Sequence, residues 1–522
     1  MRCSLRSLQY LALFTALAAA VAGLSAPTPQ QAKSQWVYPG SDGKLVYKTT
    51  PMGDKIMDFS HAGYMGGGVA LPTVAVKKTI APSSGDNTAT IQAALDEVAT
   101  LPLKDGFRGA VLLAPGVYPC AGTITIAASG VVLRGSASKG DQRSTIKLVG
   151  KPHNGITVAG KVGGLGPFTE AKTKVADRYV PSGARRFTVA DAKGFAAGDT
   201  ITVRKTITAE WVKFMGMDDL VRDGKKQTWL AAGRVLSTER QIKAVEGNQV
   251  TLDVPLSDSY DARYAGPAGT AVITIRPTWL TQIGIEHLHI ECPPQAIPHT
   301  QPHFTALRMT GQDCWARDVV CDETMTSVSV HGRRITLQQV FIHRKALHQG
   351  ASRPGEIEPG ATQTLVDRCG VTADNVWFAW SGSGTPGPLV LLHCQFLGNS
   401  RVESHHRWAT GMLYDSCQAP DGSFEFRNRG AMGSGHGWSM GWGVAWNCSA
   451  KEYIIQNPPG AANWMIGCIG KSKQTPRPFD KSGPNVPEGI LDSPGVPVAP
   501  PSLYLAQLAQ RLGPQALKNI GY

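Results

Sequence analysis

Four side chains with different chemical abilities stand together in the segment VESHHRWATGMLYDSC, residues 402–417. They are His405, His406, Arg407 and Trp408. Histidine can exchange a proton near neutral pH, arginine can neutralise a carboxylate, and tryptophan offers a flat apolar face. An apolar run typical of a β-strand follows them, so we expect the four in a loop that enters a strand.

Similar residue types stand beside neighbouring apolar runs. The additional candidates are Arg429, His436 and Trp438 in a glycine-rich stretch, Lys345 and His348 in an earlier segment, and Glu403 and Tyr414 on either side of the histidine pair. If successive runs stack on one another, these loops come together in one basic, aromatic groove. A tight loop alone could also explain the glycines around His436.

This set of residue types fits the cleavage of a uronic-acid polymer by β-elimination. A base must remove the proton alpha to a carboxylate, a cation must neutralise that carboxylate, and an acid must protonate the leaving oxygen. The expected roles are neutralisation by Arg407 or Arg429, acid or base catalysis by His405, His406 or His436, a reserve proton donor in Tyr414 if it faces outward, sugar stacking by Trp408 and Trp438, and further substrate contacts from Lys345, His348 and Glu403. Because adjacent residues of an extended chain point in opposite directions, one of the paired histidines could simply pack.

The composition indicates a large, turn-rich globular chain. Of 522 residues, 42% are hydrophobic and 17% are charged, and there are 58 glycines and 35 prolines. A net charge of +13 suits an anionic polysaccharide, nucleic acid or a membrane surface. Without a basic tail or a run of five like charges, nucleic acid is not favoured.

The N-terminus is typical of a secretory signal peptide. Arg2 and Arg6 precede an apolar run from Leu11 to Ala22, and small residues follow. We expect residues 1–26 to be removed and the mature chain to be secreted or periplasmic. The apolar run is too short for a membrane span, and we expect no other span.

Three consecutive motifs carry a family resemblance. They are DNTATIQAAL at residues 86–95, GAVLLAPGVY at 109–118 and GVVLRGS at 130–136. Their order resembles the entry to the right-handed parallel β-helix of the pectate-lyase-like superfamily. The resemblance implies an N-terminal capping helix and a solenoid of coils, whereas lyases, hydrolases and phage tailspikes all share this entry.

A repeat supports the solenoid independently. Short apolar runs end in cysteine at Cys369, Cys394, Cys417, Cys448 and Cys468, with spacings of 25, 23, 31 and 20 residues. We expect these cysteines to form an inward ladder of buried thiols, since cysteine is often fully buried. Disulfides between neighbouring coils are the alternative, because the expected Cα spacing allows them.

The fold prediction is therefore all-β. We expect one β-helix domain over residues 27–522 and a small β-module inserted at 170–275. A Pro-rich segment and a C-terminal helix capped by Ser502 should fill residues 473–522. We expect a monomer.

The functional prediction is an exported polysaccharide lyase acting on an acidic glycan. The alternatives are a glycoside hydrolase and a non-catalytic glycan-binding protein. A hydrolase needs two carboxylates about 5–10 Å apart, and the candidates are Asp322, Glu323, Asp367, Glu403 and Asp415. The GHG motif at 435–437 lacks the upstream Asp pair that usually accompanies it in β-helix hydrolases. Calcium could be held by Asp313, Asp318, Asp322 and Glu323, but we expect no obligatory metal or other cofactor.

Overall fold

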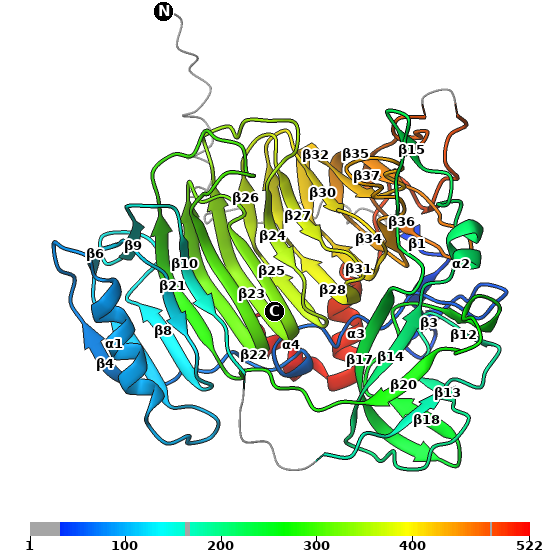
Figure 1. Ribbon diagram of the computed structural model, residues 1–522, viewed down its shortest axis with the longest axis horizontal. Helices are drawn as coiled ribbons and strands as arrows, with labels where there is room; N and C mark the ends of the chain where they lie inside the picture. The colour runs from blue at the N-terminus through cyan, green and yellow to red at the C-terminus, as the bar shows by residue number, and fades with distance from the viewer. Residues whose placement is uncertain (1–31, 162–167, 481–482) are drawn as a thin grey trace, which may run out of the picture.

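A computed structural model describes residues 32–161, 168–480 and 483–522, so the predicted signal peptide, residues 1–26, lies outside the described residues. Most of the chain runs through short strands that stack in parallel, coil upon coil (Figure 1). Each complete coil gives one strand to each of three parallel sheets, which we call faces 1, 2 and 3. This pairing confirms the parallel β-helix.

Face 1 begins with β4 (Val76–Ile80), β5 (Gly109–Leu113) and β8 (Val131–Gly135). Three long strands then contribute one part each: the start of β21 (Gly284–Glu291), the middle of β22 (Thr305–Asp322) and the second half of β23 (Val328–His343) as far as Gln338. The later coils add β25 (Thr364–Asp367), β28 (Pro386–Leu392), β31 (Ala409–Asp415), β33 (Met440–Gly441), β34 (Val444–Trp446), β36 (Trp464–Ile466) and β38 (Ile490–Asp492). Face 2 contains β6 (Gly116–Cys120), β9 (Ser144–Leu148), the ends of β21, β22 and β23, β26 (Gly370–Thr372), β29 (Gln395–Leu397), and the starts of β32 (Gln418–Phe426), β35 (Ser449–Ile455) and β37 (Ile469–Ser472). Face 3 contains β7 (Ile124–Ile126), β10 (Asn154–Val158), the starts of β22 and β23, β24 (Gly355–Pro359), β27 (Trp377–Ser381), β30 (Arg401–Ser404), and the ends of β32, β35 and β37.

The corner from face 1 to face 2 explains the cysteine repeat. One residue there takes a positive φ and turns the chain; in the five cysteine coils it is Arg368, His393, Ser416, Asn447 or Gly467. The cysteine that follows points inward and stacks on the next coil. The Cys417 thiol donates to the Leu391 carbonyl of the preceding coil at 3.2 Å. None of the nine cysteines among the described residues is in a disulfide, and all nine are buried, so the ladder consists of free thiols.

The outer surface of face 1 is covered by both ends of the chain. Apolar side chains such as Val390, Leu413 and Val444 face outward there and pack against the N-terminal segment and α3 (Leu503–Leu512). The Ser502 hydroxyl accepts from the Leu505 backbone N–H at 3.1 Å and caps this helix. α4 (Pro514–Asn519) follows α3, and β1 (Ala32–Lys33) pairs with β39 (Val498–Ala499). The later coils of face 1 are therefore covered by the chain ends.

The remaining elements pack around the stack. α1 (Thr88–Ala99) lies beside the first coils and buries four apolar side chains in the β-helix core: Ile91, Ala94, Leu95 and Val98. β2 (Val37–Pro39) pairs with β3 (Leu45–Tyr47), and the short helix η1 (Tyr64–Gly66) follows. The Pro-rich stretch is not wholly irregular, because β38 adds a strand to face 1. No helix in the described ranges is long and apolar enough to cross a membrane.

A β-module interrupts the coil between β10 of face 3 and β21 of face 1. Its antiparallel sheet has the order β11 (Lys172–Lys174), β20 (Ala271–Thr274), β14 (Thr200–Thr206), β17 (Val235–Glu246), β18 (Gln249–Leu252) and β13 (Arg186–Thr188). The smaller elements are β12 (Tyr179–Val180) with β19 (Tyr260–Asp261), β15 (Val221–Arg222) with β16 (Lys225–Lys226), α2 (Ala209–Phe214) and η2 (Ala262–Tyr264). The module lies beside the later coils, and has its own apolar core around Ile201, Val250 and Val272 (Figure 1).

Replacing Leu508 by alanine should destabilise the protein by about 2–5 kcal/mol, because a buried leucine leaves a cavity. Leu508 is 0% exposed on α3, whereas Leu512 on the same helix is 47% exposed. Urea unfolding should show little change for Leu512→Ala. Equal effects of the two substitutions would mean that α3 does not pack on face 1 as described.

Candidate active site

The outer surface of face 3 carries a row of polar and aromatic side chains in consecutive coils. The register pairs Arg308 with Ser329, Ser329 with Glu358, and Glu403 with both Trp380 and Glu425. The pairing of Ile357 with Ala379 sets Glu358 beside Trp380. Because parallel strands are about 4.8 Å apart, these side chains form one continuous floor.

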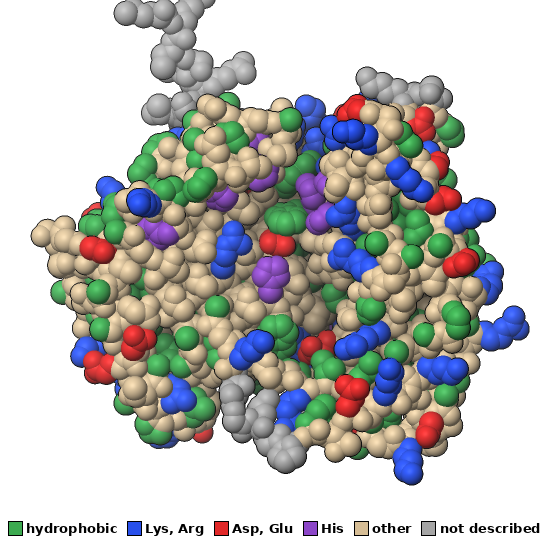
Figure 2. All heavy atoms as spheres, viewed as in Figure 1, with side chains coloured by type: hydrophobic (Ala, Val, Ile, Leu, Met, Phe, Trp, Pro, Cys, Tyr) green, Lys and Arg blue, Asp and Glu red, His purple; other side chains and the backbone are tan. Residues whose placement is uncertain are grey.

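Walls rise on both sides of this floor. The loops 293–303 and 344–354 lie at the corner from face 2 to face 3. The β-module and the loop 427–439 lie at the corner from face 3 to face 1. Between the module and the β-helix corners is a cavity of about 290 Å³, lined by Arg204, Glu239, Gly332, Gly360 and Pro386 among others. Figure 2 shows the molecule hollowed between the β-helix and the module, with histidine side chains gathered along the β-helix. We call the hollow over face 3 the groove.

Three of the histidines that the sequence singled out converge at one end of this groove. Ring centroids are 5.2 Å apart for His405 and His406, 4.8 Å for His405 and His436, and 5.2 Å for His406 and His436. Trp380 on the floor contacts the pair, with ring centroids 5.5 Å from His405 and 6.5 Å from His406. The predicted meeting of these loops is thus present in the structure.

Burial keeps these imidazoles uncharged. Burial, then the Arg429 guanidinium, holds the pKa of His405 far below its usual range. Burial and the Arg407 charge lower the pKa of His406 to about 4, and burial with the Arg429 charge lowers that of His436 to about 3. All three are therefore neutral imidazoles at neutral pH, each with a ring nitrogen that carries a lone pair.

Glu358 is a site residue that the sequence analysis missed. Burial raises the pKa of its carboxyl to about 7, against the opposing charge of Arg308. His331 lies near it, with Nε2 3.8 Å from a carboxyl oxygen. The alternating segment GEIEPG, residues 355–360, was the available signal, because Ile357 faces the core and Glu358 therefore faces out.

The two arginines hold the histidine loops in place. Arg429 Nε is 2.6 Å from Glu403 Oε1, and Arg429 Nη1 donates to the His405 carbonyl at 2.7 Å. Arg407 Nη2 donates to the hydroxyl and carbonyl oxygens of Ser434 at 2.7 and 2.9 Å. Arg429 is held in a buried ion pair, whereas no carboxylate pairs with Arg407 among the described residues. Glu403 is buried, so its predicted contact with substrate is replaced by this pairing.

The two tryptophans predicted to stack on sugars do not face the groove. Trp408 is 3% exposed and packs edge-on against Trp211 and Trp229 of the module. Trp438 lies in the same cluster, and its indole N–H donates to the Met215 carbonyl at 3.0 Å. These two tryptophans fasten the module to the β-helix and offer no face to a sugar in the groove.

Tyr414 faces inward. Its ring stacks on Phe426 in the β-helix core, with centroids 4.7 Å apart, so the condition for a reserve proton donor is not met. Lys345 is exposed in the loop 344–354. His348 in that loop is buried, and its Nε2 contacts the Ser352 carbonyl at 2.9 Å. Both belong to the wall across the floor from the loop 427–439.

The carboxylates considered for calcium do not share a site. Asp313 pairs with Arg334, Asp318 with His287, and Asp322 with His289 and His343, while Glu323 accepts backbone N–H groups of Lys345 and Ala346. No group of three or more His, Cys, Asp or Glu side chains suited to a metal ion occurs in the part of the chain that the structure describes.

Comparisons with known proteins give distant likenesses. No family model and no curated protein matches the sequence. Among solved structures, the Gp54 tailspike of Acinetobacter baumannii bacteriophage AP22 is similar at 10% identity and a TM-score of 0.37, over 74% of this chain and 61% of the tailspike. The A-module of the Azotobacter vinelandii mannuronan C-5 epimerase AlgE6 is similar at 12% identity and 0.29, over 85% and 100% of the two chains. An exopolygalacturonase from Thermotoga maritima is similar at 9% identity and 0.27, over 77% and 75%. The chain thus spans about three fifths of the tailspike's length, and at this distance the strand pairing alone establishes the fold.

Acid should weaken the protein through the buried histidines. Their folded pKa values lie below the unfolded value near 6.5, so between about pH 6.5 and 4 the unfolded chain binds protons that the folded chain refuses. Stability should therefore fall with falling pH in this range. Urea unfolding at pH 7 and pH 5 should show that His406→Gln loses less stability than the unsubstituted protein, by about 1 kcal/mol or more. An identical loss in both would contradict the buried, neutral imidazole.

Proposed function

We propose that this protein is an exported polysaccharide lyase that cleaves an acidic, uronate-containing glycan by β-elimination in the groove over face 3. The observation that carries the proposal is that the neutral imidazoles of His405 and His406 contact Trp380, and that Trp380 lies beside Glu358, whose carboxyl pKa burial raises to about 7. A neutral base and a neutral acid are the pair that elimination needs at the same pH.

The groove residues divide the reaction between them. His406 or His436 takes the proton alpha to the uronate carboxylate, and the electron pair of that C–H bond forms the new C=C bond. The bond from the β-carbon to the glycosidic oxygen breaks, and protonated Glu358 donates its proton to that oxygen. The unneutralised guanidinium of Arg407 stabilises the negative charge that grows on the carboxylate, and Trp380 offers a ring face on the floor.

The carboxylates favour elimination over hydrolysis. A hydrolase would need a second, ionised carboxylate facing the groove near Glu358. Glu403 is buried against Arg429, while Asp367 and Asp415 are buried under the chain ends, bonded to Tyr522 and to Ser502. Asp322 is engaged by His289 and His343 on face 2. Of these four carboxylates only Glu403 belongs to the floor, and it is engaged by its ion pair with Arg429.

A basic pocket on the same face supports an acidic substrate. It has a volume of about 390 Å³ and is lined by five cations, Arg353, Arg401, Arg427, Lys451 and Lys473, against three acids, Asp421, Glu425 and Glu452. Arg353 and Arg401 lie over the ring of Trp377, at 5.7 and 4.8 Å from its centroid. A polyanion that follows the floor from Trp380 therefore meets excess positive charge.

A panel of polyuronates, including polygalacturonate and alginate, should reveal the activity. We expect new ultraviolet absorbance from an unsaturated sugar end with at least one of them. Glu358→Gln and His406→Ala should each lower kcat by about a hundredfold or more, because each loses a proton-transfer group. The matched controls Glu246→Gln and His343→Ala, which lie outside the groove, should retain the activity.

Two results would contradict the elimination. New reducing ends without ultraviolet absorbance would indicate hydrolysis, and binding without cleavage of any polyuronate would indicate a glycan-binding protein.

The pH profile should identify the acid and the base. Glu358 must be protonated, so kcat should fall as pH rises through about 7, and the histidine base must be unprotonated, so kcat should fall as pH drops through about 4. Glu358→Gln should remove the alkaline limb from the residual activity. An alkaline limb that persists unchanged in this variant would assign the acid to another group.

A further inference from the structure

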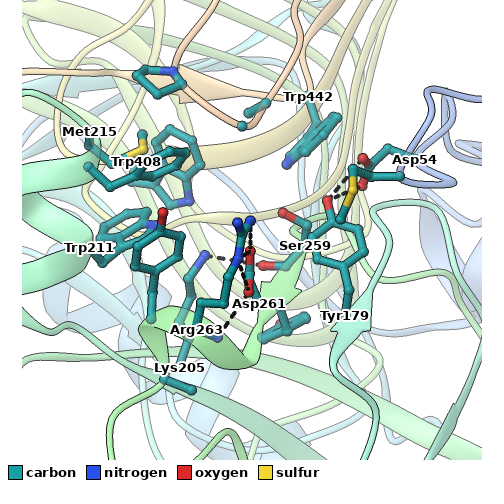
Figure 3. A pocket seen from close by; sticks show the side chains of 18 of the residues that line it. Asp54, Tyr179, Lys205, Trp211, Met215, Ser259, Asp261, Arg263, Trp408 and Trp442 are labelled. Atoms are coloured by element: carbon teal, nitrogen blue, oxygen red, sulfur yellow. Dashed lines mark hydrogen bonds and ion pairs between the residues drawn. The ribbon is translucent and has the colours of Figure 1, made fainter.

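Another pocket lies between the β-module and the N-terminal segment (Figure 3). Its volume is about 260 Å³, and four stretches of the chain line it: residues 50–54, parts of the module from 179 to 270, Trp408, and residues 442–462. Neither the three convergent histidines nor Glu358 and Trp380 line it. The pocket is therefore separate from the groove over face 3.

Aromatic rings make up much of its wall. Trp211, Phe214, Tyr264 and Trp442 all line the pocket. Phe214 and Tyr264 stack on each other with ring centroids 4.6 Å apart, and Phe214 is 37% exposed. Flat apolar rings at an open cavity suit a ligand that has a flat apolar face of its own.

One buried donor in this wall has no partner. Trp442 is 3% exposed, and its indole N–H makes no hydrogen bond with the described residues. In Figure 3 the indole nitrogen of Trp442 points into the pocket. The indole N–H groups of Trp229, Trp408 and Trp438 nearby all have acceptors, at 3.0 Å in each case. A buried donor without an acceptor is unfavourable, so a ligand oxygen at this position would satisfy it.

Both cations of the pocket are paired with carboxylates, and Asp54 is bonded to neutral donors. Lys205 Nζ is 3.0 Å from Asp258, Arg263 is 2.6 Å from Asp261, and the Tyr179 hydroxyl donates to Asp54 at 2.8 Å. An anionic ligand would find no unpaired cation in this set. The ion pairs still present oxygen and N–H groups to hydroxyls, so the pocket suits a neutral ligand with several hydroxyl groups.

We propose that this pocket binds a neutral sugar ring, with the ring's apolar face against the aromatic wall and a ring or hydroxyl oxygen accepting from the Trp442 N–H. It is a glycan-binding site independent of the catalytic groove. It would hold the enzyme on neutral sugars, while the groove acts on acidic ones.

The test is calorimetric titration of the full chain with cellobiose, maltose and lactose, and with sodium galacturonate as the charged probe. We expect at least one neutral disaccharide to bind, more tightly than galacturonate. Trp442→Phe, which keeps a ring and removes the N–H, should weaken that binding at least tenfold. The matched control is Trp315→Phe, because Trp315 is also a buried tryptophan but lies in another cluster and does not line the pocket.

A second pair of variants guards against a misfolded tryptophan variant. Phe214→Ala should weaken disaccharide binding, whereas Phe479→Ala, an exposed ring outside the pocket, should not. Glu358→Gln should bind the disaccharide normally, which separates this proposal from the catalytic one. Failure of all three disaccharides to bind, preferential binding of galacturonate, or unchanged affinity in both Trp442→Phe and Phe214→Ala would overturn the proposal.

Discussion

In-register stacking of parallel strands is the constraint on which the rest of this structure depends. Each coil repeats the same inward and outward positions, so one residue in each coil lies directly beside its equivalent in the next. On the inside this alignment gives the free thiol ladder that ends at Cys468. On the outside of face 3 it sets Glu358 beside Trp380, and it brings the loops after β30 and β32 together, so that His405, His406 and His436 meet.

The other faces and the module decide where a ligand can lie. The chain ends cover the later coils of face 1 with apolar contacts. The module is held beside face 3 by a cluster of tryptophans, Trp211, Trp229, Trp408 and Trp438. The groove therefore has a rigid floor, from the β-helix, and a wall from a separate fold, and both keep water away from the imidazoles whose pKa values burial lowers.

Sequence pattern was sufficient for the fold but only for part of the site. The Cys repeat and the entry motifs gave the coils, because core positions recur at each turn of a solenoid. The meeting of His405, His406 and His436 followed from the same reasoning. The roles expected of Trp408 and Trp438 failed, because their partners Trp211 and Trp229 come from the module about 200 residues earlier, and no local pattern marks such a contact. Tyr414 failed for a simpler reason: it follows the alternation of β31 and faces the core beside Phe426.

We propose that an acidic glycan lies along the outer surface of face 3. A crystal structure of Glu358→Gln with an acidic oligosaccharide bound tests it most directly. We expect sugar density over Trp380, with a uronate near Arg407, a ring carbon facing His406 or His436, and the chain continuing toward Arg353. Density confined to face 2, or to the outer side of the module away from these histidines, would contradict it.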